Sequence, residues 1–408
     1  MVVPKLRFKA DDGSDYPEWN NFTKLEDISA FITKGATPTT YGFEWQPKGV
    51  YFFRNDCIKN NVFVYGDYSF IAEEANKFLQ RSEVTGGDIV IAITGDIGKV
   101  GLIPSEVKKA NINQHLARVR IVKGVFPYFV YMYLCSDKVQ HTYKKIKTGL
   151  SMPQLSLAQI RDTNIPVVSL PEQQKIAEFL STIDTVIEKQ KETVSAWEEC
   201  KKGVMQKLFS QEVRFKTDDG NDFLDWEEKK LGDVGDIVTG NTPATKQEDY
   251  YGGYYLWVTP TDITDSREVF STAKMLTASG YAVARHVPAN SVLVTCIASI
   301  GKNAILRENG SCNQQINSIT PYEGYSMEFV YYLICQNKKL LHVNAGTGGV
   351  EILNKDSFSK IKMYFPCYVE QQKIADCLSS LDDVVEKQKE TLAAWEELKK
   401  GLLQQMFV

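Results

Sequence analysis

The sequence is poor in the cysteine patterns that mark several protein classes. Its 408 residues include 8 cysteines, and no two of them are spaced as Cys-x-x-Cys. This absence argues against a zinc ribbon and against a thioredoxin-type redox motif. The cysteines are also too sparse for a disulfide scaffold. We therefore expect reduced thiols and a cytoplasmic location.

Long apolar runs and a strong excess of one charge are missing as well. Residues 1–8 lack the apolar core of a signal peptide. The longest strongly apolar stretch, near residues 125–135, is too short to span a bilayer. With 47 Lys+Arg, 51 Asp+Glu and 43% hydrophobic residues, the composition is that of an ordinary globular protein. We predict no membrane association.

Motifs for common enzyme chemistries are absent. The sequence has no Gly-x-Ser-x-Gly elbow, no His-Glu-x-x-His zinc motif and no Asn/Asp-Pro-Pro-aromatic tetrapeptide. Gly-Lys pairs at 98–99 and 301–302 suggest a phosphate loop, but two residues separate Gly95 from Gly98 and Val follows Lys99. A Walker A loop needs four residues there and a Ser or Thr after the Lys. We predict a turn after a buried strand, or more sharply a DNA-contacting loop.

The four histidines are scattered along the chain, so we expect no metal site. His115 stands out because of its context, Asn113-Gln114-His115, and it is a candidate for lying near a site. A structural or exposed histidine is the alternative.

The sequence contains an internal repeat with an offset of 198 residues. Residues 172–209 align with residues 370–407 without a gap, and 25 of the 38 aligned positions are identical. A second similarity opens each half, where Arg7-Phe-Lys-Ala-Asp-Asp-Gly is matched by Arg214-Phe-Lys-Thr-Asp-Asp-Gly, and Trp19 by Trp226. Between these repeats the halves mostly diverge. The chain therefore alternates variable and near-duplicated segments: residues 1–171, 172–210, 211–369 and 370–408.

The duplicated segments have the pattern of a coiled coil. Apolar or seam residues recur in alternating steps of four and three, a period of 3.5 residues sustained over about four heptads. Pro171 suits a helix start, and a 38-residue helix would be about 57 Å long. We predict that the two helices pair within the chain, with a homodimeric coiled coil as the alternative. The seam residues are Ile176, Leu180, Ile183, Ile187, Val194 and Trp197 in the first helix, and Ile374, Leu378, Leu381, Val385, Leu392 and Trp395 in the second.

The two variable segments have the pattern of mixed α/β (α+β) domains with many short strands. Strand candidates are residues 50–53, 87–94, 254–258 and 291–297, and short apolar helix candidates are residues 128–135 and 328–335. Residues 1–171 carry a net charge of +4, whereas residues 211–369 carry −4. Neither value is basic enough to establish nucleic-acid binding by composition.

An ordered set of motifs resembles the specificity (S) subunit of type I restriction–modification systems. The set consists of Leu6-Arg-Phe with Trp19, repeated as Val213-Arg-Phe with Trp226; Lys230-Leu-Gly-Asp leading to Gly240-Asn-Thr-Pro, mirrored by Gly35-Ala-Thr-Pro; Tyr255-Leu-Trp-Val-Thr-Pro-Thr-Asp-Ile; and Pro166-x-x-x-x-Pro-Glu-Gln-Gln-Lys-Ile-Ala. The second copy of the last motif departs by shortening to Pro366-Cys-Tyr-Val-Glu370. The resemblance covers essentially the whole chain.

The resemblance implies a fold and a division of labour. Residues 1–171 and 211–369 would be target recognition domains, each reading one half of a split double-stranded DNA site. Residues 172–210 and 370–408 would be helices that pair antiparallel, separate these domains and dock two methyltransferase (M) subunits, with restriction (R) subunits in the full complex. Adenine methylation with S-adenosylmethionine, and cleavage with ATP and Mg, would belong to M and R. The chain would then be no enzyme and would hold no cofactor.

Because the two variable segments differ in sequence, we predict an asymmetric bipartite target. Base edges and phosphates are contacted by polar and basic side chains on loops. We predict contacts from Thr37, Thr39, Arg54, Asn55, Lys99, Lys144, Lys145, Lys147 and Thr148 in the first segment, and from Thr242, Thr245, Lys246, Thr259, Thr261, Lys302 and Thr347 in the second. Ordinary solvated loop residues are the alternative for each.

Two other functions compete with DNA recognition. A coiled-coil structural adaptor would explain the helices but not the two divergent globular segments. The recognition half of a self-contained modification enzyme would need a catalytic domain, for which the repeats leave no room. DNA binding by the chain argues against the adaptor, and methyl transfer by the isolated chain would argue for the enzyme.

Overall fold

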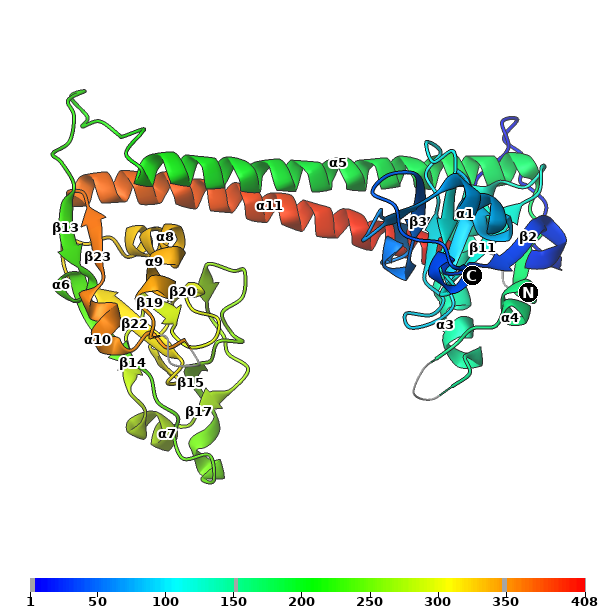
Figure 1. Cartoon of the computed structure of the whole chain (residues 1–408). Coiled ribbons are helices and arrows are strands. Elements are labelled where there is room, and N and C mark those ends of the chain that lie inside the picture. Colours follow the sequence, from blue (N-terminus) through cyan, green and yellow to red (C-terminus); the bar gives the residue numbers. More distant parts are fainter. Residues whose placement is uncertain (1–3, 150–152, 347–350, 408) are drawn as a thin grey trace. The chain divides into compact units, whose positions relative to one another are not determined.

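The computed structural model describes residues 4–149, 153–346 and 351–407 (Figure 1). It consists of two units, Met1–Lys191 with Thr391–Val408, and Glu192–Glu390. Two long helices, α5 (Leu170–Phe209) and α11 (Tyr368–Met406), contribute one part to each unit. Each unit therefore combines one globular segment with the N-terminal part of the helix that follows it and the C-terminal part of the other helix.

Short strands build the first globular segment. One sheet has the order β6 (Ser69–Ile71), β3 (Val50–Phe53), β10 (Ala110–Ile112), β7 (Glu83–Val84), and another has the order β2 (Ser29–Lys34), β11 (Leu116–Ile121), β8 (Ile89–Ala92), β9 (Val100–Leu102). Smaller pairs are β1 (Phe22–Lys24) with β12 (Asn164–Pro166), and β4 (Ile58–Lys59) with β5 (Val62–Phe63). The helices are α1 (Glu73–Phe78), α2 (Pro127–Cys135), α3 (Asp137–Ile146) and α4 (Leu157–Arg161).

The second globular segment is built in the same way. One sheet has the order β17 (Met275–Leu276), β15 (Tyr251–Val258), β21 (Gly310–Cys312), β18 (His286–Val287), and another has the order β14 (Gly235–Thr239), β22 (Ile316–Pro321), β19 (Ser291–Thr295), β20 (Asn303–Leu306), β16 (Glu268–Val269). A smaller pair joins β13 (Glu227–Lys230) to β23 (Lys362–Phe365). The helices are α6 (Leu231–Val234), α7 (Ala278–Val283), α8 (Met327–Gln336), α9 (Lys338–Val343) and α10 (Lys355–Lys360).

The two segments share one strand topology. The parallel pair β3–β10 corresponds to β15–β21, and the antiparallel order β2-β11-β8-β9 corresponds to β14-β22-β19-β20. The antiparallel pairs β1–β12 and β13–β23 join the beginning of each segment to its end. The predicted mixed α/β class is confirmed. The strand candidates are observed as β3, β8, β15 and β19, and the helix candidates as α2 and α8.

Helices α2 and α8 carry the centre of each core. Residues 129–134 of α2 and 329–334 of α8 are all buried, because these helices are apolar on every side. They pack against the neighbouring sheet and against the start of the long helix that follows. No helix among the described residues is long and apolar enough to cross a membrane.

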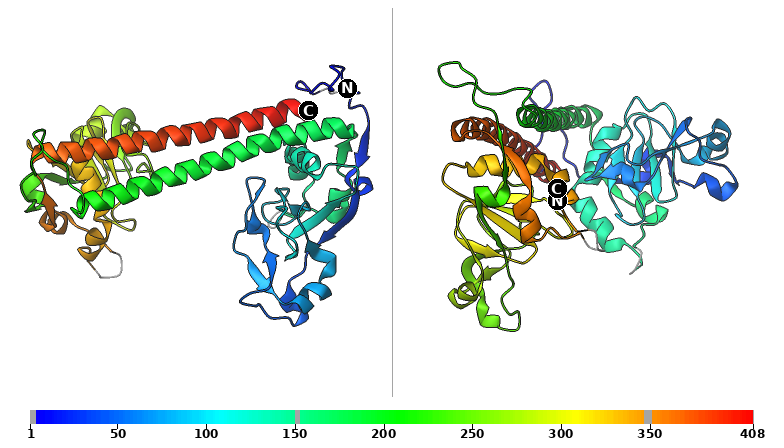
Figure 2. Two further views of the ribbon diagram at one scale, coloured as in Figure 1. Left: turned by 90° about the horizontal axis from the view of Figure 1, so that it is seen from above. Right: turned by 60° about the vertical axis from the view of Figure 1, so that its left-hand side comes forward.

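Within each unit, α5 and α11 lie side by side (Figure 2). In the first unit Leu180 shares a core with Met406, and in the second unit Leu378 shares a core with Leu208. Early residues of one helix thus meet late residues of the other, so the helices run antiparallel. The predicted pairing within the chain is confirmed. The predicted seam residues are all buried or half-buried.

Ion pairs flank this seam in the same pattern in both units. They are Asp184–Lys399 and Lys191–Glu396 in the first unit, and Lys201–Asp382 and Lys389–Glu198 in the second. Each pair in one unit maps onto a pair in the other by the 198-residue offset of the repeat. The duplicated sequence therefore encodes the pairing register twice.

A buried carboxylate ties the start of each segment to its long helix. The fully buried Glu172 accepts hydrogen bonds from Arg7 (Nη2 to Oε1, 2.8 Å) and from Trp19 Nε1 (3.2 Å). In the second unit the buried Glu370 accepts from Arg214 Nη2 at 2.8 Å. A buried charge is tolerated when it is paired in this way. This contact explains why the Arg and Glu motifs, about 160 residues apart in the sequence, recur together.

The next residue of the repeat, a glutamine, makes a second connection. Gln173 accepts from the backbone N–H of Phe126 (2.9 Å) and donates to a carbonyl just before α5 (2.7 Å). Gln371 accepts from the backbone N–H of Ser326 (2.9 Å) in the equivalent way. The Glu-Gln pair of each repeat therefore holds the globular segment and the start of its helix together.

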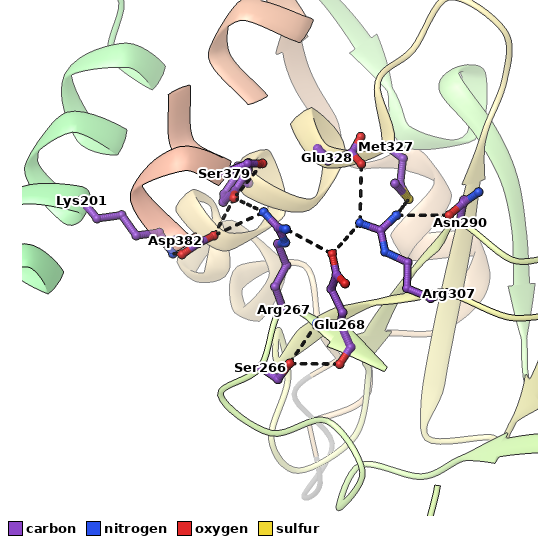
Figure 3. Close-up of polar contacts among 11 residues, drawn as sticks. Lys201, Ser266, Arg267, Glu268, Asn290, Arg307, Met327, Glu328, Ser379 and Asp382 are labelled. Carbon is purple, nitrogen blue, oxygen red and sulfur yellow. Dashed lines mark hydrogen bonds and ion pairs between the residues drawn. The ribbon is translucent and has the colours of Figure 1, made fainter. Parts of the chain in front are cut away.

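The second unit adds a polar network between its globular segment and the helices (Figure 3). Arg267 donates to the phenol of Tyr332 (3.0 Å), and its guanidinium lies 3.8 Å from Asp382 of α11. Glu268 accepts from Arg307 (2.6 Å) and from Arg267 (3.1 Å). The hydrogen bond from Arg307 lowers the pKa of the Glu268 carboxyl below its ordinary value.

In both units a tyrosine of the core helix also donates to an aspartate of the long helix. In the second unit Tyr332 of α8 donates to Asp382 at 2.5 Å. Tyr128 of α2 donates to Asp184 of α5, the residue that corresponds to Asp382. Burial and the neighbouring Asp184 raise the pKa of the Tyr128 phenol, so it remains a proton donor.

Candidate nucleic-acid interface

Four loops meet at the strand ends of each globular segment. We call them the TP loop (35–40 and 240–245), the strand-end loop (54–57 and 259–262), the GK loop (93–99 and 296–302) and the NQ loop (113–115 and 313–315). The strand-end loop follows β3 or β15 and the NQ loop follows β10 or β21. Because these strands are parallel neighbours, the two loops lie at one edge of the sheet. The backbone N–H of Asn113 donates to the carbonyl of Phe53 (3.0 Å), and Asn313 donates to Val258 (2.9 Å).

The TP loop packs directly on the NQ loop, and only glycine fits at the contact. A Cβ on Gly35 would lie 2.1 Å from the carbonyl oxygens of Ile112 and Asn113. A Cβ on Gly240 would lie 2.1 Å from the carbonyl oxygen of Cys312. The glycine of each Gly-x-Thr-Pro motif is therefore required for this close backbone approach.

The contact places a threonine beside an exposed glutamine in both segments. Thr37 Oγ1 donates to Gln114 Oε1, and Thr242 Oγ1 donates to Gln314 Oε1 at 2.5 Å. Gln114 and Gln314 are exposed, although the residues before them are buried. The glutamine amide groups therefore project from the edge of the sheet.

The GK loop has the same backbone form in both segments. Gly98 and Gly301 have φ of 81° and 85°, and their N–H groups donate to the carbonyls of Ala92 and Thr295. The predicted turn after a buried strand is confirmed, because β8 and β19 are fully buried. The loop is joined to the NQ loop by a backbone hydrogen bond to His115 (2.9 Å) or Gln315 (2.8 Å).

In the first segment the histidine of the NQ loop joins these loops further. His115 Nδ1 pairs with the Thr94 hydroxyl, and its Nε2 lies 3.1 Å from Gln114 Nε2. If Gln114 Nε2 donates to His115 Nε2, the ring proton is on Nδ1, and the Thr94 hydroxyl accepts a hydrogen bond from Nδ1. His115 thus lies at the four-loop edge.

A basic hollow lies beside the GK loop of the first segment. Its volume is about 440 Å³, and Lys99, Lys144 and Lys147 line it together with Asn60 and Asn61. Three lysines predicted as DNA contacts are therefore brought together, although 48 residues separate the first from the last. Asp96 also lines the hollow and pairs with Lys99 at 2.5 Å.

The other predicted contacts are placed as follows. Thr37, Thr39, Arg54, Asn55, Thr242, Thr245, Thr259, Thr261 and Lys302 lie on the four loops, Lys246 follows the TP loop, and Lys145 and Thr148 are exposed near the end of α3 outside the hollow. Thr347 lies outside the described residues. No residue of this set is tested as a DNA contact, so the assignments stay predictions.

Arg54 is engaged within its own segment. Its Nη2 donates to Ser69 Oγ (2.8 Å), its Nη1 donates to the carbonyl of Asp67 (3.1 Å), and its guanidinium lies 5.3 Å from the ring centre of Trp45. These contacts fix the side chain at the start of the strand-end loop. Some of its N–H groups are therefore already hydrogen-bonded within the chain and are not available to a ligand.

Several residues of this edge escaped the sequence reasoning. Asn60 and Asn61 have φ of 51° and 59°, and they line the hollow with Gln140. Gln314 was missed although the pair Asn-Gln occurs at both 113–114 and 313–314. That repeat, at an offset of 200, was the available signal. Among the described residues, no cluster of three or more His, Cys, Asp or Glu side chains could hold a metal ion.

The two globular segments share one strand topology and one arrangement of loops, and paired long helices accompany them. Together these features define a duplicated two-domain architecture. The family model for the type I restriction modification DNA specificity domain matches this chain twice, at residues 17–195 and 224–394. The chain belongs to this family of type I restriction–modification specificity (S) subunits, the non-catalytic components of those systems.

Relatives and solved structures agree with this assignment. The chain is 31% identical over 208 residues to the type I restriction enzyme MjaIX specificity subunit of Methanocaldococcus jannaschii, covering 49% of this chain and 48% of that protein. It is 22% identical to the putative MjaX specificity subunit of the same organism, over 97% of this chain and 94% of that protein. The match to the first relative thus spans about half of that protein's length.

The fold is similar to that of a crystallised type I restriction–modification S subunit from M. genitalium. The TM-score is 0.59 at 14% sequence identity, and the match covers 100% of this chain and 99% of that chain. At this identity the similarity concerns the fold alone.

Proposed function

We propose that this chain recognises an asymmetric, bipartite double-stranded DNA target, with one globular segment on each half-site. The observation that carries the proposal is the four-loop edge, which recurs on both segments with the same backbone contacts. The two edges share this backbone frame but differ in many side chains. Arg54 and Asn55 stand where the second segment has Thr259 and Pro260. Different base-reading groups on one frame would select different half-sites.

Phosphate binding is best supported in the first segment. The cluster of Lys99, Lys144 and Lys147 offers three ammonium groups to one hollow. Lysine contacts to phosphate give affinity and salt dependence without sequence preference. In the second segment the corresponding loop offers the exposed Lys302.

The partners that this function requires are other subunits of the same system. We propose that the paired helices dock two methyltransferase (M) subunits and, through them, restriction (R) subunits in the cytoplasm. S-adenosylmethionine, ATP and Mg would be bound by those partners. The chain itself would position the duplex so that M can extrude and methylate an adenine.

Selection from a random duplex library tests this function. The purified complex of the chain with its methyltransferase partner should enrich DNA that carries two different short motifs at a fixed separation. A coiled-coil adaptor would enrich no motif. Binding without sequence enrichment would therefore refute the proposed recognition, and a single palindromic motif would refute the asymmetry.

A further inference from the structure

The two loop edges share a small set of side chains although the segments otherwise diverge. Some shared positions are explained by the fold. Gly35 and Gly240 are required by close backbone contact, and the buried Asn113 and Asn313 each accept a backbone N–H two residues later (3.1 and 3.0 Å). Other shared residues are polar groups at or near the surface, and core packing does not account for them: Thr37 and Thr242, Thr40 and Thr245, Lys99 and Lys302, Gln114 and Gln314.

The hydrogen bond from threonine fixes what the glutamine can offer. In both segments the threonine hydroxyl donates to the Oε1 of the glutamine. The Nε2 group, which only donates, is left to face outward. Nε2 of Gln114 has His115 Nε2 as a neighbour at 3.1 Å, whereas no acceptor among the described residues takes a hydrogen from Nε2 of Gln314. Each glutamine therefore presents N–H toward an incoming acceptor.

An acceptor that both half-sites share is the phosphate backbone. A glutamine that reads adenine uses both its oxygen and its nitrogen, to pair with N6 and N7. Here the threonine hydroxyl already takes one of the two lone pairs of the oxygen in both segments and fixes the amide orientation, so bidentate reading is disfavoured. The shared lysine of the adjacent GK loop is also a donor only, and it suits the same partner.

On the basis of the proposed DNA recognition, we infer that Gln114 and Gln314 are equivalent contacts to backbone phosphate, one in each half-site. They act beside Lys99 and Lys302 and carry no base preference. The target sequence is then determined by the positions at which the two edges differ. Thr37 and Thr242 also act as positioning residues, because their hydroxyls orient the glutamine amide.

Charge substitutions at the glutamine separate a phosphate contact from base reading. We expect Gln114→Ala and Gln314→Ala, tested in the complex with the methyltransferase partner, each to weaken binding to the selected duplex by about ten-fold, the loss of one charge-assisted hydrogen bond. Gln114→Glu should weaken binding more, because a carboxylate repels phosphate. Gln114→Arg should restore the affinity that Gln114→Ala loses. The motif obtained by library selection should be the same for every variant.

The controls keep this inference apart from the proposed function. Gln80→Glu changes an exposed glutamine that lies on none of the four loops, and its affinity should equal that of the parent. If the parent complex selects a bipartite motif but Gln114→Arg changes a base in it, Gln114 reads a base and the inference is wrong. If Gln114→Ala and Gln314→Ala bind as tightly as Gln80→Glu, neither glutamine contacts DNA. If the parent selects no motif, the proposed function itself fails.

Discussion

Single residues at the loop edge owe their behaviour to neighbours that are distant in sequence. Lys99 illustrates this, because its ammonium group pairs with Asp96 and faces Lys144 and Lys147 across the hollow. The ion pair is largely exposed, so it stabilises the fold little. Its larger effect is on binding, since Asp96 places a negative charge where phosphate would approach. The second segment has Ser299 at the corresponding position.

Substitutions at this pair should change DNA affinity in opposite directions. Lys99→Ala should weaken binding by the complex and reduce the slope of log affinity against log salt by about 1, because one phosphate contact is lost. Asp96→Ser, which copies the second segment, should strengthen binding at low salt. The measurement is a salt titration of affinity for the selected duplex. Lys123→Ala, an exposed lysine outside the four loops, is the control, and equal slopes for Lys99→Ala and this control would remove Lys99 from the interface.

Part of this edge could be predicted from the sequence, and part could not. The Gly-x-Thr-Pro and Gly-Lys motifs were visible because close backbone contact in the first, and a positive φ in the second, need glycine at fixed places. The convergence of Lys144 with Lys99 was not visible, because it depends on how α3 packs beside the GK loop. The inward hydrogen bonds of Arg54 were hidden for the same reason, so its prediction as a DNA contact rested on residue type and its place on a loop.

At the scale of elements, the long helices were the most predictable part of the fold. Their 3.5-residue apolar period specifies a partner helix, and the duplicated sequence supplies one within the chain. The buried Glu172 and Glu370 were not predicted as anchors, although their motif was noticed. The apolar period of the sequence indicates which face of a helix is packed. A buried ion pair between residues about 160 positions apart leaves no such local pattern.

Charges placed in the helix seam should dismantle this arrangement. Leu180→Asp combined with Leu378→Asp buries two unpaired carboxylates at positions that are fully buried, at a cost of roughly 3 kcal/mol or more each. We expect a lower unfolding temperature and loss of co-purification with the methyltransferase partner. Gln80→Asp with Ser271→Asp, exposed positions in the two globular segments and outside both long helices, should leave both properties unchanged. Full co-purification of the seam variant would show that the helix pair does not organise the complex.

The network at Glu268 predicts a specific pH dependence. Because hydrogen bonding by Arg307 lowers the pKa of this carboxyl in the folded chain, its ionised form stabilises the fold at pH values above the unfolded pKa. That stabilisation is lost as the pH falls through the lowered pKa. Between about pH 5 and about pH 3, the free energy of unfolding should therefore fall less for Glu268→Gln than for the parent. Denaturant titrations measure this, with Glu308→Gln, an exposed residue, as the control. Parallel curves for parent and Glu268→Gln would contradict the assignment.

At the scale of the whole molecule, one strand plan is used twice with different surfaces. The two larger sheets of each globular segment correspond in strand order, with β16 added in the second segment. The sequences nevertheless diverge, and the net charge is +4 for residues 1–171 but −4 for residues 211–369. The repeat of the fold predicts two similar modes of docking on DNA, and the divergence of the loops predicts two different half-sites.

Modified-base sequencing of host DNA, with and without this chain and in the presence of its methyltransferase partner, tests this account most directly. We predict a split adenine-methylated motif whose two halves differ and which appears only when the chain is present. A palindromic motif would contradict the assignment of one distinct half-site to each segment. Methylation that does not depend on the chain, with the methyltransferase shown to be active beside another specificity subunit, would contradict the recognition role itself.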